Sequence, residues 1–163
     1  YARIVGVLRP LVGDEADDLA QEVFVRLYRD PPQAADTDLG AWLYRVATNL
    51  GYNALRGRKR WTSYLQRAAR LIGGADWREP EPDPEAQAIG AEESLRVRRA
   101  LAQLNKQQAS ILVLRYNGLS YREIAAAIGV APTSVGTLLA RAEASFARAF
   151  RRAEEPQRRA GED

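Results

Sequence analysis

Apolar residues recur at every third or fourth position along most of this chain, which is the spacing of one face of an α-helix. No segment alternates strictly between apolar and polar residues, as a half-buried strand would. The pattern therefore predicts an all-α fold. One predicted helix shows the spacing over three turns, with an apolar face made of Leu39, Trp42, Leu43, Val46, Ala47 and Leu50.

Glycine and proline residues divide the first part of the chain into three predicted helices. The first begins at Tyr1 and breaks at Gly13. The second ends at Pro31, because proline cannot continue a helix beyond its first turn. The third begins near Asp38, whose side chain suits a helix N-cap, and stops near Gly57.

The stretch 119–139 predicts two short helices joined by a tight turn, the geometry of a DNA-binding helix-turn-helix. Gly129 ends the first helix, where a left-handed residue is wanted. Pro132 follows in the first turn of the second helix, where its missing N–H costs nothing. Ala125 allows the two helices to approach closely. Four apolar residues predict a small shared core: Ile124, Ile128, Val130 and Val135. An ordinary helical hairpin is the alternative interpretation.

A change of composition separates the two halves of the chain. Between Ile72 and Gly90, glycines and prolines lie among acidic residues, which is typical of a linker. The sequence therefore predicts two small helical domains joined by a flexible acidic linker. The chain starts in what is predicted to be a helix, so the first domain is expected to lack its N-terminal part. The predicted divisions are a first domain at 1–62, a linker at 63–92, a second domain at 93–153 and a polar tail at 154–163.

Basic residues are concentrated in the second half. From Ser94 to Ala153 there are ten basic residues against two acidic ones, Glu123 and Glu143. Such a surface binds DNA phosphates with release of counterions, although a solvated helix face has the same composition. The exposed positions of the second short helix are small and uncharged, so contacts to the DNA backbone and shape are expected to matter more than guanine recognition. The candidate duplex-binding residues are Arg122, Pro132, Thr133, Ser134, Gly136, Thr137 and Arg141.

The chain has no cysteine and no histidine. Disulfides and thiol chemistry are excluded, zinc lacks its usual ligands, and the commonest general acid–base is missing. No metal or cofactor is predicted. An enzyme such as a recombinase would need a nucleophile in a catalytic domain, and no strand-rich unit surrounds the Tyr and Ser residues. No stretch approaches the ~20 apolar residues of a membrane span, so we expect a cytoplasmic protein without membrane insertion.

Two regions of the first half carry polar residues with a candidate role. On the second predicted helix Asp18, Gln21 and Glu22 face away from the apolar stripe, where they can contact another protein or form an ordinary exposed surface. Near the end of the third, aromatic, amide and basic residues are interleaved. Bases pulled from a duplex need a stacking surface, hydrogen-bond partners and positive charge for the backbone. The candidate single-strand residues are Asn49, Tyr52, Asn53, Arg56, Arg58, Lys59, Arg60 and Trp61.

Taken together, these segments resemble the bacterial sigma factors of the extracytoplasmic-function (ECF) group. The matching segments, in the family's order, are DLAQEVFVRLY (18–28), LGAWLYRVATNLGYNALRGRKR (39–60) and LNKQQASILVLRYNGLSYREIAAAIGVAPTSVGTLLARA (104–142). The resemblance implies that the first domain docks on the clamp helices of the largest RNA polymerase subunit through Asp18, Gln21 and Glu22. It also implies that Asn49 captures a flipped base of the −10 promoter element.

For the second domain, the resemblance implies docking on the polymerase flap, with the helix that begins at Pro132 in the major groove of the −35 element. The implied function is a dissociable promoter-recognition subunit of core RNA polymerase, without catalysis of its own and associated with the nucleoid. An anti-sigma factor is a further implied partner. The alternative is a stand-alone helix-turn-helix regulator, which would dimerise to read paired half-sites. The chain shows no evident dimerisation segment, and this alternative leaves the basic and aromatic cluster unexplained.

Overall fold

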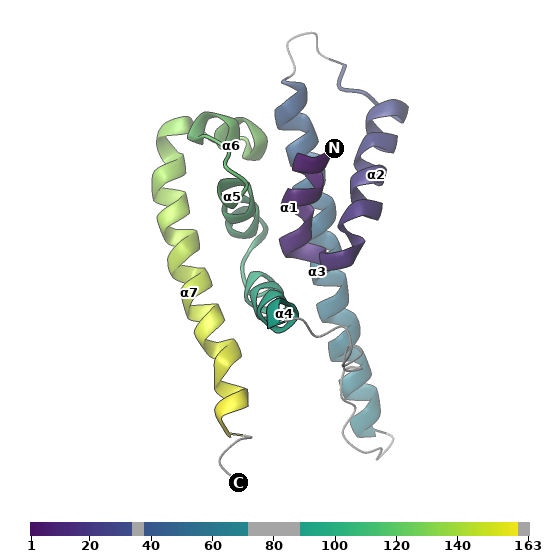
Figure 1. Cartoon of the computed structure of the whole chain (residues 1–163), viewed down its shortest axis with the longest axis vertical. Coiled ribbons are helices and arrows are strands. Elements are labelled where there is room, and N and C mark those ends of the chain that lie inside the picture. Colours follow the sequence, from purple (N-terminus) through teal and green to yellow (C-terminus); the bar gives the residue numbers. More distant parts are fainter. Residues whose placement is uncertain (34–37, 72–88, 160–163) are drawn as a thin grey trace.

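The structure is a computed structural model that describes residues 1–33, 38–71 and 89–159, with side chains described over 1–33, 38–60 and 90–153. Every regular element in these ranges is helical, which confirms the predicted all-α fold (Figure 1). The greater part of the predicted linker, residues 72–88, lies outside the described residues.

The N-terminal half consists of three helices, of which α1 packs on both of the others (Figure 1). The predicted break at Gly13 is confirmed, and its φ of 66° is one that glycine adopts without strain. The predicted cap is confirmed too, since Asp38 Oδ1 accepts a hydrogen bond of 3.1 Å from the Ala41 N–H. The elements are α1 (Ala2–Val12), η1 (Gly13–Glu15), α2 (Ala16–Arg29) and α3 (Leu39–Leu71).

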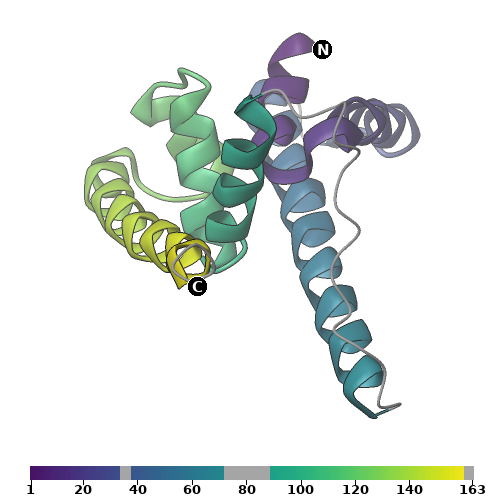
Figure 2. The same ribbon diagram turned by 60° about the horizontal axis from the view of Figure 1, so that its bottom comes forward.

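Helix α3 is longer than the sequence pattern predicted. The predicted stop near Gly57 is wrong, because α3 continues to Leu71 and extends beyond the rest of the molecule (Figure 2). One glycine inside a helix costs only about 1 kcal/mol relative to alanine. Residues 58–71 contain neither proline nor a further glycine, so nothing local ends the helix. The positions 63–71, predicted as the start of the linker, are therefore helical.

The C-terminal half contains the predicted helix-turn-helix. Both α5 and α6 begin with a capping box, made by Asn105 with Gln108 and by Ser120 with Glu123. Gly129 has the predicted left-handed conformation, with φ 73° and ψ 43°. The second helix of the motif opens with a 3₁₀ turn at Pro132 before its α-helical part. The elements are α4 (Ile89–Leu101), α5 (Lys106–Tyr116), α6 (Tyr121–Ile128), η3 (Pro132–Ser134) and α7 (Val135–Arg159).

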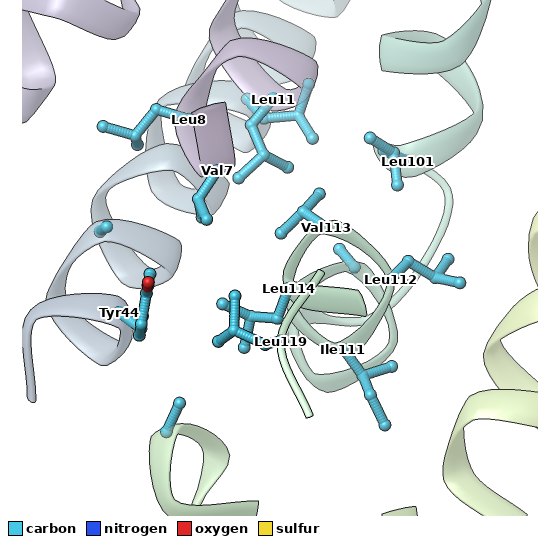
Figure 3. Close-up of a cluster of buried hydrophobic side chains, with 14 of the residues drawn as sticks. Val7, Leu8, Leu11, Tyr44, Leu101, Ile111, Leu112, Val113, Leu114 and Leu119 are labelled. Atoms are coloured by element: carbon cyan, nitrogen blue, oxygen red, sulfur yellow. The ribbon is translucent and has the colours of Figure 1, made fainter. Parts of the chain in front are cut away.

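The two halves share one hydrophobic core, with α5 at its centre (Figure 3). Four consecutive α5 residues, 111–114, are buried. Ile111 points toward α7, whereas Leu114 lies on the side of α3, where Tyr44 is 8% exposed. A helix that is apolar on all sides must be covered on all sides. Here the N-terminal half covers one side of α5 and α7 covers the other.

Candidate nucleic-acid interface

The exposed surface of the helix-turn-helix lies along η3 and the start of α7. Ser134, Thr137 and Arg141 are three and four positions apart, so they share one side of the helix, and Thr133 is exposed beside them. We call these four residues the duplex face. Pro132 and Arg122 are exposed nearby. A helix with this much uncovered surface and a cation at its edge can enter a DNA groove.

Gly136 was expected to be exposed, and this expectation is wrong. It is half-buried, because the start of α7 turns it toward the Tyr121 ring. A Cβ atom at position 136 would lie 3.6 Å from Tyr121 Cε2, an ordinary van der Waals contact. The Arg115 guanidinium lies over the same ring, 5.6 Å from its centroid. The Tyr121 ring, at the start of α6, thus lies close to Arg115 of α5 and to Gly136 of α7.

The start of α6 is held by a charged cap. One carboxylate oxygen of Glu123 accepts hydrogen bonds of 2.7 Å from both the N–H and the hydroxyl of Ser120. These hydrogen bonds favour the ionised carboxylate and lower the pKa of Glu123 below its usual range. The first helix of the motif therefore begins at a defined position relative to the duplex face.

One side of α3 carries polar side chains over four turns, spaced three to four residues apart. We call this set the polar face of α3; it consists of Arg45, Asn49, Tyr52, Arg56 and Lys59. All of its members except Arg45 were predicted to contact a single DNA strand. In the structure this face instead lies against the C-terminal half, where α5 and α6 pack on α3.

The C-terminal part of the polar face contacts residues 102–104, which follow the end of α4. The Tyr52 hydroxyl donates to the Leu104 carbonyl at 2.8 Å, and Arg56 Nη1 donates to the Ala102 carbonyl at 3.2 Å. Lys59 Nζ donates to the same Ala102 oxygen at 3.4 Å and to Gln103 Oε1 at 3.1 Å. Burial beneath the end of α4 lowers the pKa of Lys59, and the neighbouring Arg56 charge lowers it further.

The N-terminal part of the polar face lines a hollow of about 320 Å³ between α3, α5 and α6. Arg45 also donates from Nε to the Ala127 carbonyl at 2.9 Å and from Nη2 to the Ala126 carbonyl at 2.8 Å. The sequence analysis did not select Arg45 as a site residue. The one indication that the sequence offers is helical spacing, which places Arg45 on the same side of the helix as Asn49 and Tyr52. The hollow is lined by Arg45, Thr48, Asn49, Lys106, Gln107, Ser110, Ala127 and Ile128.

The remaining single-strand candidates do not belong to the polar face. Arg58 turns to the opposite side, where it forms an ion pair with Glu15 and donates to the Val12 carbonyl. Asn53 and Arg60 are exposed. The side chain of Trp61 lies outside the described residues. The predicted cluster therefore does not form one surface. Part of it lies on the polar face, Arg58 lies on the opposite side, and Asn53 and Arg60 are exposed to solvent.

The protein-contact candidates lie on α2, on the side of the N-terminal half away from α7 (Figure 1). Asp18 and Gln21 are exposed, and Glu22 forms an ion pair of 2.8 Å with Arg26. Two apolar residues that the sequence analysis passed over continue this surface, since Val25 and Tyr28 follow at helical spacing and Tyr28 is 90% exposed. We call Asp18, Gln21, Glu22, Val25 and Tyr28 the outer face of α2. An exposed aromatic residue such as Tyr28 is typical of a protein-binding surface, because aromatic residues are enriched there.

Neither a metal site nor a membrane-spanning helix is found in the described ranges. No group of three or more Asp or Glu residues there could hold a metal ion. No single helix in that part of the chain is long and apolar enough to cross a membrane. Helix α6 and residues 132–153 reach that length and apolar composition only together, and a bend of 87° separates them.

The sequence matches two models of known families, in positions that correspond to the two halves. Residues 1–61 match sigma-70 region 2, and residues 94–145 match sigma-70 region 4. The chain is 33% identical over 152 residues to the ECF RNA polymerase sigma factor SigG of Mycobacterium tuberculosis, a match that covers 81% of this chain but only 41% of SigG. Identity to the RNA polymerase sigma-H factor of Pseudomonas aeruginosa is 33% over 146 residues, 85% of this chain and 74% of that protein. Identity to the ECF sigma factor SigW of Bacillus subtilis is 28% over 143 residues, 84% of this chain and 76% of SigW.

Proposed function

This chain belongs to the ECF group of RNA polymerase sigma factors, and from that premise we propose that it directs core RNA polymerase to specific promoters and helps to open the −10 region. The observation that carries the proposal is the combination of two surfaces in one chain. The duplex face suits an intact double helix, and the polar face of α3 offers amide, phenol and cationic groups for a single strand. Promoter opening needs both.

In the first domain, proposed to span residues 1–62, Asn49 receives a flipped base of the non-template strand. Its amide can donate and accept hydrogen bonds with a base edge. The hollow beside Asn49 supports this role. Tyr52, Asn53 and Trp61 contact neighbouring bases, while cations hold the strand backbone. These cations are Arg56, Lys59 and Arg60, whereas Arg58 is paired with Glu15 on the opposite side of α3.

In the second domain, proposed to span residues 93–153, the duplex face enters the major groove of the −35 element. Its small uncharged side chains favour contacts to the backbone and to DNA shape. Gly136, at the edge of this face, has no side chain, so it adds no bulk to the start of α7 where the helix enters the groove. Arg122 and Arg141 contact phosphates on either side, which is the usual role of a cation at the rim of a recognition helix. Residues 63–92 and 154–163 complete the proposed division as linker and tail.

The proposed partner of the outer face of α2 is the pair of clamp helices in the largest polymerase subunit. Its mixture of carboxylate, amide and exposed aromatic groups supports this role, with Tyr28 as the apolar anchor. The second domain is proposed to dock on the polymerase flap. The protein would then have no catalytic role of its own and would act in the cytoplasm, at the nucleoid. An anti-sigma factor is a further proposed partner.

Transcription from genomic DNA tests this function directly. Core polymerase supplemented with this protein should produce run-off transcripts that start at a defined set of promoters, and sequencing the transcripts identifies them. Core polymerase alone is the control. Absence of stimulation on every template would contradict the proposal. A stand-alone regulator would instead bind its sites without co-purifying with polymerase subunits.

Charge reversal at Arg141 should weaken duplex binding. In Arg141→Glu, loss of a phosphate contact should reduce the slope of log K against log salt by about 1 and lower the affinity by roughly tenfold at low salt. Fluorescence anisotropy with promoter duplexes over a salt series measures both. The matched control is Arg29→Glu, an equal charge change at an exposed position on α2. Equal slopes for Arg141→Glu and the unmodified chain would remove Arg141 from the phosphate contacts.

A further inference from the structure

The hollow between α3, α5 and α6 is lined by a buried hydroxyl that the fold leaves without a partner. Ser110 of α5 lines the hollow and is only 5% exposed. Among the described residues its hydroxyl forms no hydrogen bond, whereas the hydroxyl of Thr48, buried at the same hollow, donates to the Tyr44 carbonyl at 2.9 Å. Buried polar groups are normally hydrogen-bonded. A ligand in the hollow would supply the partner that Ser110 lacks.

Two amide side chains in the same hollow form no hydrogen bond within the described part of the chain. Asn49 of α3 is half-buried, and Gln107 of α5 is exposed. Each amide can both donate and accept. Ala127 and Ile128, at the end of α6, add apolar surface to the lining. A nucleobase matches this combination, because its edge carries donors and acceptors and its flat face packs on apolar side chains.

The hollow is positively charged. The described residues that line it include two cations, Arg45 and Lys106, and no acid. Arg45 uses two N–H groups for the carbonyls at the end of α6, but a guanidinium has more donors than these two bonds need. Lys106 forms no ion pair within the described ranges. Two cations without an acid beside them suit an anionic group such as a phosphate.

The position of Lys106 supports an anion independently of the cavity. Lys106 is the first residue of α5, and the first turn of this helix has no acidic residue. A cation is unfavourable there, because the free N–H groups of a helix N-terminus and the helix dipole already carry positive charge. A bound anion reverses the effect, since the N–H groups and the ammonium group then attract the same ligand.

We propose that this hollow binds a free nucleoside monophosphate. The phosphate contacts Arg45, Lys106 and the start of α5, and the base contacts Asn49 and Gln107. The hollow of about 320 Å³ is at the small end of the range for ligand pockets, which suits one compact ligand. The inference goes beyond the proposed function, in which Lys106, Gln107 and Ser110 have no role. Because the ligand contacts both halves, it stabilises their packed arrangement by mass action.

Titration of the full chain with AMP, GMP, CMP and UMP, in the absence of DNA and polymerase, tests the site. Isothermal titration calorimetry should show one bound nucleotide per chain for at least one of the four. That nucleotide should raise the Tm by about 5–10 °C when its concentration is about a hundredfold above its Kd. The corresponding nucleoside and inorganic phosphate should each bind at least about tenfold more weakly, because each lacks one part of the ligand. Failure of all four nucleotides, or equally tight binding of inorganic phosphate, would overturn the proposal.

Two variants test whether the nucleotide lies in the hollow. Ser110→Ala should weaken its binding by about two- to tenfold, the range for one hydrogen bond. Lys106→Gln should weaken it by about tenfold without changing nucleoside binding, because the lost charge acts on the phosphate. Arg29→Gln, the same charge change at an exposed position on α2, is the matched control and should bind like the unmodified chain. Equal losses in Lys106→Gln and Arg29→Gln would show non-specific attraction and overturn the site. Lys106 is exposed, so its variant decides even if Ser110→Ala does not fold.

A DNA strand carries the same phosphate and base groups, so a short single-stranded oligodeoxynucleotide is titrated in parallel. Binding of the oligodeoxynucleotide without binding of any free nucleotide would assign the hollow to a strand and overturn the proposal. These titrations contain neither promoter nor polymerase. Their result is therefore distinguishable from failure of the proposed function, which would appear as absence of promoter-specific transcription whether or not a nucleotide binds.

Discussion

Replacing Asn49 with alanine should lower the yield of open promoter complexes by about ten- to a hundredfold. Flipping a base costs a few kcal/mol of stacking and pairing, which contacts in the receiving site must offset. Loss of the amide leaves the polar edge of the flipped base without its hydrogen-bond partner, which costs about 1–3 kcal/mol and spans that range of fold-change. Permanganate footprinting of unpaired thymines around the −10 element, with core polymerase present, measures the effect.

Gln21→Ala is the reciprocal control for this prediction. Gln21 is exposed on the outer face of α2, far from the hollow that Asn49 lines. It should weaken binding to core polymerase, whereas Asn49→Ala should leave that binding nearly intact. Thermal unfolding of both variants checks that neither change disturbs the fold. Equal losses of melting and of polymerase binding in Asn49→Ala would contradict its proposed role.

Replacing Leu114 with alanine should reduce the free energy of unfolding by about 2–5 kcal/mol, the range for a large-to-small change at a buried leucine. Leu114 is fully buried on α5, at the centre of the core that both halves share. The truncated side chain leaves a cavity that α3 and α5 cannot close without moving. Urea denaturation followed by circular dichroism gives the free energy and shows whether the halves still unfold together.

Leu39→Ala is the matched control, because Leu39 lies at the start of α3 and is 46% exposed. The same chemical change there should alter the free energy of unfolding by no more than about 0.5 kcal/mol. A cost below about 1 kcal/mol for Leu114→Ala would show that the N-terminal half does not cover α5 in solution.

Local chemistry made several of the helix boundaries predictable. Gly13 and Gly129 have the positive φ that ends a helix, and Asp38 caps the next one, because each effect depends on a few neighbouring residues. The wrong prediction that α3 ends near Gly57 also came from considering only local effects. A single glycine is a weak signal inside a helix, and the favourable residues that follow it outweigh its cost.

The candidate surfaces were predictable to different degrees. Exposure of Thr133, Ser134 and Thr137 follows from the helix-turn-helix pattern, because the short core of that motif determines which side faces outward. The partial burial of Gly136 beside Tyr121 depends on the angle between α6 and α7, which no local pattern specifies. Tyr28 was passed over because the sequence alone does not show which apolar residues of α2 stay uncovered.

The amino-acid sequence by itself determined that the chain is helical, where several of its helices begin or end, and that it resembles ECF sigma factors, because periodicity, caps and motifs are local properties. Only the tertiary structure decided what the polar face of α3 contacts. Helical spacing places Arg45, Tyr52 and Lys59 on one side of a helix but does not say which surface meets that side. The apolar run at 111–114 required cover on every side of α5, and only the packed halves revealed that the N-terminal half provides it.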